Sequence, residues 1–175
     1  MSSRRTIGSI PNILSCSRLA LAAGFVASSA TETQVGIIGA AAVSDFLDGW
    51  FARRVKATSR FGAMLDPIAD RFFVLTVVAT MLYTGRINTH EYFVMIARDI
   101  MTAVGFLVAR VVPWLRRVTF QARMSGKVVT VLQMITLAAL LLTPAIAPWL
   151  IAAVGVASVL SIADYTLALW RARAR

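Results

Sequence analysis

The feature that most constrains this chain is a series of six long apolar runs separated by short polar connections. The runs cover residues 13–28, 34–52, 62–84, 92–112, 126–143 and 147–169. Several approach the length that crosses a bilayer. Because an open strand in lipid leaves backbone groups unpaired, we expect each run to be a helix. The sequence therefore predicts an all-α polytopic membrane protein of six transmembrane helices, preceded by a short N-terminal interfacial segment.

Composition agrees with a membrane protein of one domain. Hydrophobic residues make up 58% of the 175 residues and charged residues only 15%, whereas soluble domains carry about 25% charged residues. We find no linker or convincing repeat in the sequence that would mark a second unit. We therefore expect residues 1–175 to form a single transmembrane domain.

The formal charge of +10 comes from basic residues placed between the apolar runs. A nucleic-acid-binding protein gathers such residues on a soluble face, so we expect no nucleic-acid partner. Both termini and the connections around 53–60 and 110–127 are rich in Lys and Arg, whereas 29–34, 85–91 and 143–148 hold at most one. The positive-inside rule then places both termini and the two basic connections on the cytoplasmic side of the membrane.

Four of the eight acidic residues lie within a short stretch of the second and third runs: Asp45, Asp48, Asp66 and Asp70. Asp45 and Asp48 are three residues apart and share a helix face, as do Asp66 and Asp70, which are four apart. Carboxylates at the edge of a membrane are costly unless they are paired or bind metal. Because no His or Cys cluster suits zinc, we expect divalent cations, Mg²⁺ or Mn²⁺, near the cytoplasmic interface.

Small residues flank these acids. Gly49 follows Asp48, and Gly62 lies one turn before Asp66, so a bulky ligand can approach the backbone at both places. Close packing of membrane helices is the alternative explanation for Gly49, Ala52 and Gly62. Beside four acids, we favour a slot for a nucleotide diphosphate.

Eight positions in this stretch resemble the signature of the CDP-alcohol phosphatidyltransferase family. They are Asp45, Asp48, Gly49, Ala52, Arg53, Gly62, Asp66 and Asp70. The similarity extends to the opening segment 10–18, to 96–99 and to 126–133. It implies a six-helix membrane enzyme, commonly a homodimer, with a two-metal site open to the cytoplasm.

The resemblance also implies a role for each signature residue. Asp45, Asp48 and Asp66 would bind the metals, and Asp70 would complete the metal site and act as the catalytic general base. A fourth metal ligand without a proton-transfer role is the alternative for Asp70. The CDP part of the donor, CDP-diacylglycerol, would lie along the signature residues Gly49, Ala52, Arg53 and Gly62.

The acceptor alcohol is predicted less directly. Arg98, Arg110, Arg123 and Lys127 lie near the basic fourth connection and are candidates to bind a phosphate on the acceptor. Arg110 and Arg123 serve equally well as orientation signals, and Arg98 has Asp99 beside it as an ion-pair partner. The segments 10–18 and 126–133 resemble bacterial phosphatidylglycerophosphate synthases, which implies glycerol 3-phosphate as acceptor. Asp99 replaces the Glu usual in that group and is closer to cardiolipin synthases, whose acceptor is phosphatidylglycerol.

Two other classes of protein remain as alternatives. A cation transporter would carry polar residues along a path through the bilayer, but here the acids gather at one end of two helices. A non-catalytic membrane scaffold would be expected to have lost a signature acid, and all four are present. We therefore predict a metal-dependent phosphatidyltransferase. The sequence assigns no role to Asp164, the acidic residue of the sixth apolar run.

Overall fold

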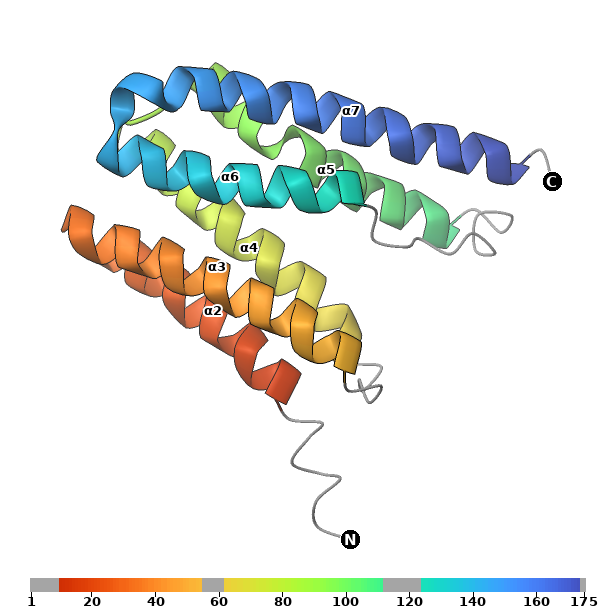
Figure 1. Ribbon diagram of the computed structural model, residues 1–175, viewed down its shortest axis with the longest axis horizontal. Coiled ribbons are helices and arrows are strands. Elements are labelled where there is room, and N and C mark those ends of the chain that lie inside the picture. The colour runs from red at the N-terminus through yellow and green to blue at the C-terminus, as the bar shows by residue number, and fades with distance from the viewer. Residues whose placement is uncertain (1–9, 55–61, 112–123, 174–175) are drawn as a thin grey trace, which may run out of the picture. The chain divides into compact units, whose positions relative to one another are not determined.

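The computed structural model describes residues 10–54, 62–111 and 124–173 (Figure 1). Within these ranges the chain is all-α, as predicted, and contains six long helices and one short 3₁₀ turn. The elements are α2 (Ile10–Ala27), α3 (Thr31–Arg54), α4 (Gly62–Tyr83), α5 (Thr89–Val111), α6 (Met124–Leu142), η2 (Pro144–Ile146) and α7 (Ala147–Arg173). The predicted interfacial segment falls mostly on residues 1–9, which lie outside the described ranges.

The contacts of the chain divide it into two compact units, Met1–Arg86 and Ile87–Arg175. In the first unit, α2 packs against both α3 and α4, and Figure 1 shows these three helices in red to yellow. Phe25 of α2 is fully buried, as are Phe73 and Val77 of α4. The central position of α2 brings it into contact with both helices that carry the signature acids.

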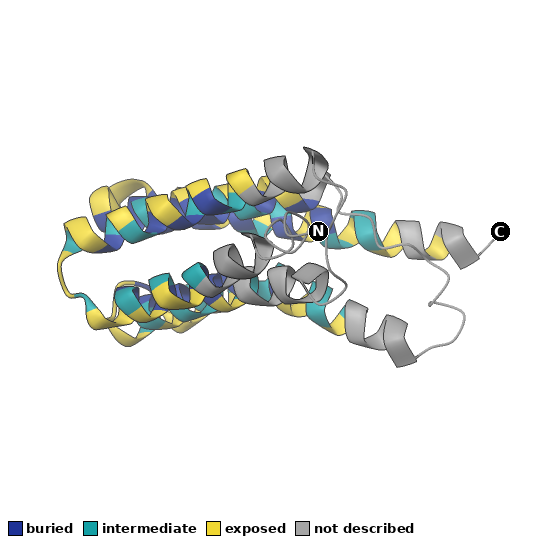
Figure 2. Cartoon of the chain, turned by 90° about the horizontal axis from the view of Figure 1, so that it is seen from below, coloured by how far each residue is buried: buried dark blue, intermediate teal, exposed yellow. Residues whose placement is uncertain are grey.

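In the second unit, α7 packs against both α5 and α6. Its core contains Met95, Leu137 and Val154, one from each helix. Gly155 allows α7 to approach α5 closely, because a Cβ built there would lie 3.0 Å from Val94 Cγ1. Buried and exposed residues alternate along each helix in Figure 2, so each helix has one packed face.

Local hydrogen bonds fix where α4 ends and α5 begins. Gly85, at φ 70°, donates its N–H to the Leu82 carbonyl, and Arg86 N–H bonds to the Met81 carbonyl. This is the Schellman arrangement that ends a helix at a glycine. Asn88 and Glu91 then exchange side-chain-to-backbone hydrogen bonds of 2.9 and 2.8 Å, a capping box that starts α5.

One described segment, Pro144–Leu167, has the length and apolar composition to cross a membrane. Ser17–Ala27, Arg71–Tyr83 and Gly126–Leu142 are apolar but shorter. The charged residues inside α3 and α5 lower the hydropathy of those helices. The six helices of the described ranges agree with the predicted number, and their crossing of a bilayer remains a prediction.

Candidate active site

The signature residues lie on α3 and α4. Asp45 and Asp48 lie in the second half of α3, and Asp66 and Asp70 in the first turns of α4.

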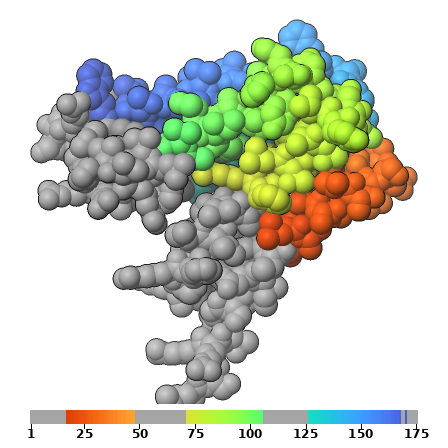
Figure 3. All heavy atoms as spheres, turned by 180° about the vertical axis from the view of Figure 1, so that it is seen from behind, coloured from red at the N-terminus to blue at the C-terminus, as the bar shows by residue number. Residues whose placement is uncertain are grey.

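Only Asp45 has its side chain among those the structure describes. The others are Asp48, Gly49, Ala52, Arg53, Gly62, Asp66 and Asp70, whose helical positions are given but whose side chains fall outside the described set. In Figure 3 the residues whose side chains the structure describes are coloured by residue number, and the others are grey. The predicted convergence of the four carboxylates therefore stays a prediction.

Asp45 forms an ion pair with Arg18 of α2, in which Nη2 lies 3.2 Å from Oδ1. The Arg18 side chain is only 4% exposed, whereas that of Asp45 is 44% exposed. A buried guanidinium thus holds one oxygen of a partly accessible carboxylate. Sequence reasoning gave Arg18 no role of its own, although a charge inside the first apolar run was a signal for one.

The donor chemistry of the signature acids fits a hard cation. All four are carboxylates, and oxygen donors suit Mg²⁺ or Mn²⁺ rather than zinc. Within the described part of the chain, no three His, Cys, Asp or Glu side chains form a group that could hold a metal. Since three of the four acids lie outside that set, the predicted metal site is neither supported nor contradicted by this result.

A second polar cluster lies inside the unit formed by α5, α6 and α7. Arg98 Nη1 donates to Asp99 Oδ1 and to Thr130 Oγ1, at 3.1 Å each. The other Asp99 oxygen, Oδ2, accepts a 2.9 Å bond from Gln133 Nε2. The Gln133 Nε2 group also donates to the Met95 carbonyl at 2.7 Å. These bonds join α5 to α6 inside the unit.

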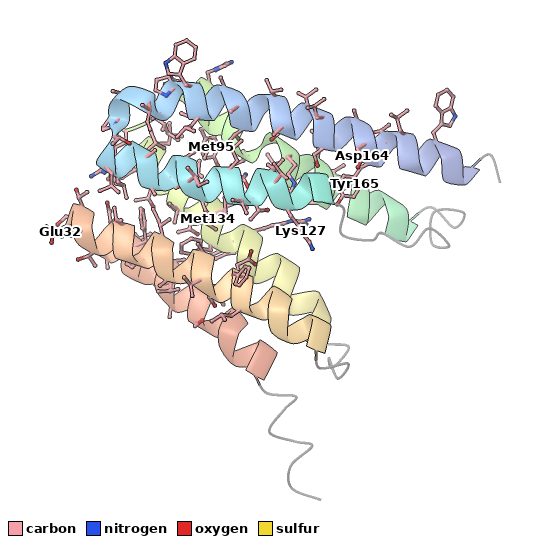
Figure 4. All side chains as sticks on the ribbon, in the orientation of Figure 1. Glu32, Met95, Lys127, Met134, Asp164 and Tyr165 are labelled. Atoms are coloured by element: carbon pink, nitrogen blue, oxygen red, sulfur yellow. The ribbon has the colours of Figure 1, made fainter. Side chains whose placement is uncertain are left out.

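The guanidinium of Arg98 lies directly over Gly126. A Cβ on Gly126 would be 2.9 Å from Arg98 Nη2 and 3.4 Å from the Tyr165 hydroxyl. Figure 4 labels Tyr165 on α7 and Lys127 on α6. The absence of a side chain at residue 126 is therefore what makes room for Arg98.

Arg98 keeps hydrogen-bonding capacity that the described residues do not use. Its side chain is 13% exposed, and its Nε is buried without a hydrogen-bond partner there. Both Nη1 hydrogens are used by Asp99 and Thr130. An unsatisfied buried donor on a charged group is costly, and an anionic ligand is one group that would satisfy it.

Comparison with known proteins decides the family. Residues 8–168 match the CDP-alcohol phosphatidyltransferase family. The chain belongs to this family. The matched region contains all eight signature positions and the whole Arg98 cluster.

Several curated proteins are similar to this chain. The CDP-diacylglycerol–glycerol-3-phosphate 3-phosphatidyltransferase of Aquifex aeolicus is 36% identical over 110 residues, which cover 58% of this chain and 61% of that protein. The protein of the same name from Escherichia coli K12 is 37% identical over 108 residues, which cover 59% of this chain and 57% of that protein. The chain thus matches about three fifths of the length of these curated relatives.

In this CDP-alcohol phosphatidyltransferase family member, the four predicted acceptor residues have different outcomes. Arg98 is half-buried and pairs with Asp99, as its position beside Asp99 suggested. Lys127 is exposed on α6. Arg110 lies on α5 with its side chain outside the described set, and Arg123 lies outside the described residues.

Sequence reasoning assigned no role to three residues of the Arg98 cluster. Gly126, Thr130 and Gln133 are spaced by four and three residues, so they form one stripe on α6. A polar stripe inside an apolar helix was the signal in the sequence. Its partner on α5 lies more than thirty residues away, and the stripe alone did not identify it.

Proposed function

We propose that this chain transfers the phosphatidyl group of CDP-diacylglycerol to glycerol 3-phosphate, giving phosphatidylglycerol phosphate and CMP. The observation that carries the proposal is the family match over residues 8–168, with all eight signature positions present on α3 and α4. The relatives named for this reaction support glycerol 3-phosphate as the acceptor.

In the proposed reaction, a hydroxyl oxygen of glycerol 3-phosphate attacks the phosphorus that bears the diacylglycerol. A new P–O bond forms, and the bond from that phosphorus to the bridging oxygen breaks, so CMP leaves with the electron pair. Asp70 takes the hydroxyl proton as the attack proceeds. Asp45, Asp48, Asp66 and Asp70 would hold two divalent cations, which when bound neutralise charge on the diphosphate and on the departing CMP.

The residues around the acids have binding roles in this proposal. Gly49 and Gly62 leave space for the CDP group beside the acids, together with Ala52, and Arg53 supplies a positive charge for the diphosphate. Arg18 orients Asp45 through their ion pair.

The acceptor phosphate is assigned to the Arg98 cluster. The donors that Arg98 retains suit a phosphate oxygen, because guanidinium groups bind phosphate through charge-assisted hydrogen bonds. Lys127 is exposed next to Gly126 and adds a second positive charge. Arg110 and Arg123 belong to the same basic part of the chain and complete the proposed acceptor-binding set.

The proposed setting is a bacterial-type inner membrane. The six helices would cross it, with both termini and the active site on the cytoplasmic side, where Lys and Arg are concentrated. The acyl chains of the donor would then stay in lipid while glycerol 3-phosphate arrives from water. A homodimer is the oligomer that we propose from the family resemblance.

Identification of the lipid product tests this function. Purified protein would receive CDP-diacylglycerol, Mg²⁺ or Mn²⁺, and either glycerol 3-phosphate or phosphatidylglycerol, with lipids separated by thin-layer chromatography. We expect phosphatidylglycerol phosphate and CMP only with glycerol 3-phosphate. Formation of cardiolipin from phosphatidylglycerol would instead make the chain a cardiolipin synthase. Failure to release CMP with any of a panel of acceptors would favour a scaffold.

A further inference from the structure

The polar cluster on α5 and α6 contains buried residues, Gln133 and Asp99, that a phosphate bound by Arg98 would not need to contact. Gln133 is 1% exposed, and both hydrogens of its amide nitrogen are used, one by the Met95 carbonyl and one by Asp99. It makes no contact that the proposed reaction needs. Its hydrogen bonds instead fix the carboxylate that holds Arg98.

The bonds form an ordered series from Gln133 to the guanidinium. Gln133 donates to Asp99 Oδ2, which leaves Oδ1 to accept from Arg98 Nη1. The Thr130 hydroxyl donates to the Gly126 carbonyl at 3.2 Å and accepts from the same Nη1. Two acceptors on two helices therefore fix the orientation of Nη1, and with it the plane of the guanidinium.

Gly126 determines how closely the Arg98 guanidinium approaches α6. Its missing Cβ lets Nη2 lie against the α6 backbone, at a separation where a methyl group would collide. The side of the guanidinium that Asp99 and Thr130 do not use carries Nε and Nη2. Two parallel N–H groups on that side are the arrangement that binds an oxyanion in a bidentate manner.

We propose that Gln133 and Asp99 are positioning residues that hold the Arg98 guanidinium over Gly126, with its Nε and Nη2 donors kept for an oxyanion of the acceptor. The proposal rests on the proposed function for the identity of that acceptor. It adds two residues, neither in contact with substrate, that determine how well glycerol 3-phosphate binds.

Steady-state kinetics of CMP release separate positioning from general stability. We expect Gln133→Leu and Asp99→Asn each to raise KM for glycerol 3-phosphate about tenfold, as the loss of a hydrogen bond to a charged group predicts. The KM for CDP-diacylglycerol and kcat should stay within about twofold. Asp99→Glu keeps the charge and should recover part of the loss. An equal rise in both KM values, or a fall in kcat alone, would overturn the proposal.

Thr136→Val is the matched control. Thr136 lies three residues after Gln133 on α6, is fully buried, and donates only to the Leu132 carbonyl of its own helix. The Thr136→Val substitution removes a buried hydroxyl and leaves the hydrogen bonds of the Arg98 cluster unchanged. We expect wild-type KM values for both substrates; a tenfold rise in KM for glycerol 3-phosphate would show that any polar loss in α6 has this effect.

A substitution at Gly126 tests the position of Arg98 without removing any of its hydrogen-bond partners. Gly126→Ala would displace Arg98 Nη2 and should also raise KM for glycerol 3-phosphate by about tenfold, although it changes no hydrogen-bonding residue. Gly105→Ala on α5 is its control, since a Cβ there meets nothing within 4 Å. Unchanged KM in Gly126→Ala would contradict the assigned position of Arg98.

Equilibrium binding of radiolabelled glycerol 3-phosphate distinguishes failure of this proposal from failure of the proposed function. Wild-type protein should bind it, with glycerol unable to compete, and Gln133→Leu should bind about tenfold more weakly. Binding with this difference but without turnover would refute the function and support the positioning role. Equal binding by wild type and Gln133→Leu, or no binding by either, would refute the positioning role.

Discussion

At the scale of single residues, the account depends on acids that repel one another. Like charges a few ångströms apart destabilise a site unless cations neutralise them. The pair of Arg18 and Asp45 supplies one positive charge from a neighbouring helix. One arginine offsets one of four carboxylates, so the remaining charge still favours divalent cations.

The first prediction concerns Asp66 and Asp70. We expect Asp66→Asn and Asp70→Asn each to lower the rate of CMP release by about a hundredfold or more, because a metal ligand or the general base is lost. Circular dichroism should show that both variants keep their helices.

Glu32→Gln is the control for those variants, since it removes an exposed acid from the first turn of α3. It should turn over at the wild-type rate. Near-wild-type turnover in Asp66→Asn or Asp70→Asn would refute the role assigned to that residue.

Residue chemistry also explains which parts of the site were predictable. The Arg98–Asp99 pair was anticipated because the two residues are adjacent in sequence. Gln133 was missed because an uncharged amide in an apolar run has no visible partner until α5 and α6 are placed side by side. The convergence of the signature acids remains a prediction from spacing and family resemblance.

At the scale of helices, apolarity located the elements but did not define their ends. The predicted runs began at residues 13, 34 and 92, whereas α2, α3 and α5 begin at Ile10, Thr31 and Thr89. Each helix extends into polar sequence because end groups can be satisfied locally. The capping box of Asn88 and Glu91 does this for α5.

The end of α4 gives a second prediction. Gly85 has φ 70°, a left-handed conformation that costs other residues about 1–2 kcal/mol. Gly85→Ala should therefore lower the free energy of unfolding by about that amount, measured as a fall in Tm in detergent.

Gly36→Ala provides the comparison, because a Cβ there meets nothing within 4 Å and its φ is not positive. We expect it to leave Tm unchanged or raise it slightly, as alanine favours helix. Equal effects of the two substitutions would mean that the turn after α4 does not require glycine.

At the scale of the whole molecule, the all-α class and the six helices of the described ranges followed directly from the six apolar runs. The division into two compact units did not, because apolar periodicity shows which faces pack and not which helices share a core. The single domain over residues 1–175 remains our proposal for the functional unit. Orientation in the membrane likewise rests on the distribution of Lys and Arg.

A third prediction tests that orientation by cysteine labelling in intact cells, in a Cys16→Ser background. A membrane-impermeant maleimide should label Ala145→Cys, which lies in η2 between α6 and α7, without permeabilisation. Thr58→Cys, in the basic second connection, should react only after the membrane is opened. The reverse pattern would place the active site on the opposite side of the membrane.

The central claim is that the signature aspartates bind divalent cations. Electron paramagnetic resonance of Mn²⁺ titrated into purified protein measures this directly, with and without CDP-diacylglycerol. We predict saturable binding of about two Mn²⁺ per chain, abolished or strongly weakened in Asp66→Asn and retained in Glu32→Gln. No saturable Mn²⁺ binding by wild-type protein, whether or not CDP-diacylglycerol is present, would contradict the account.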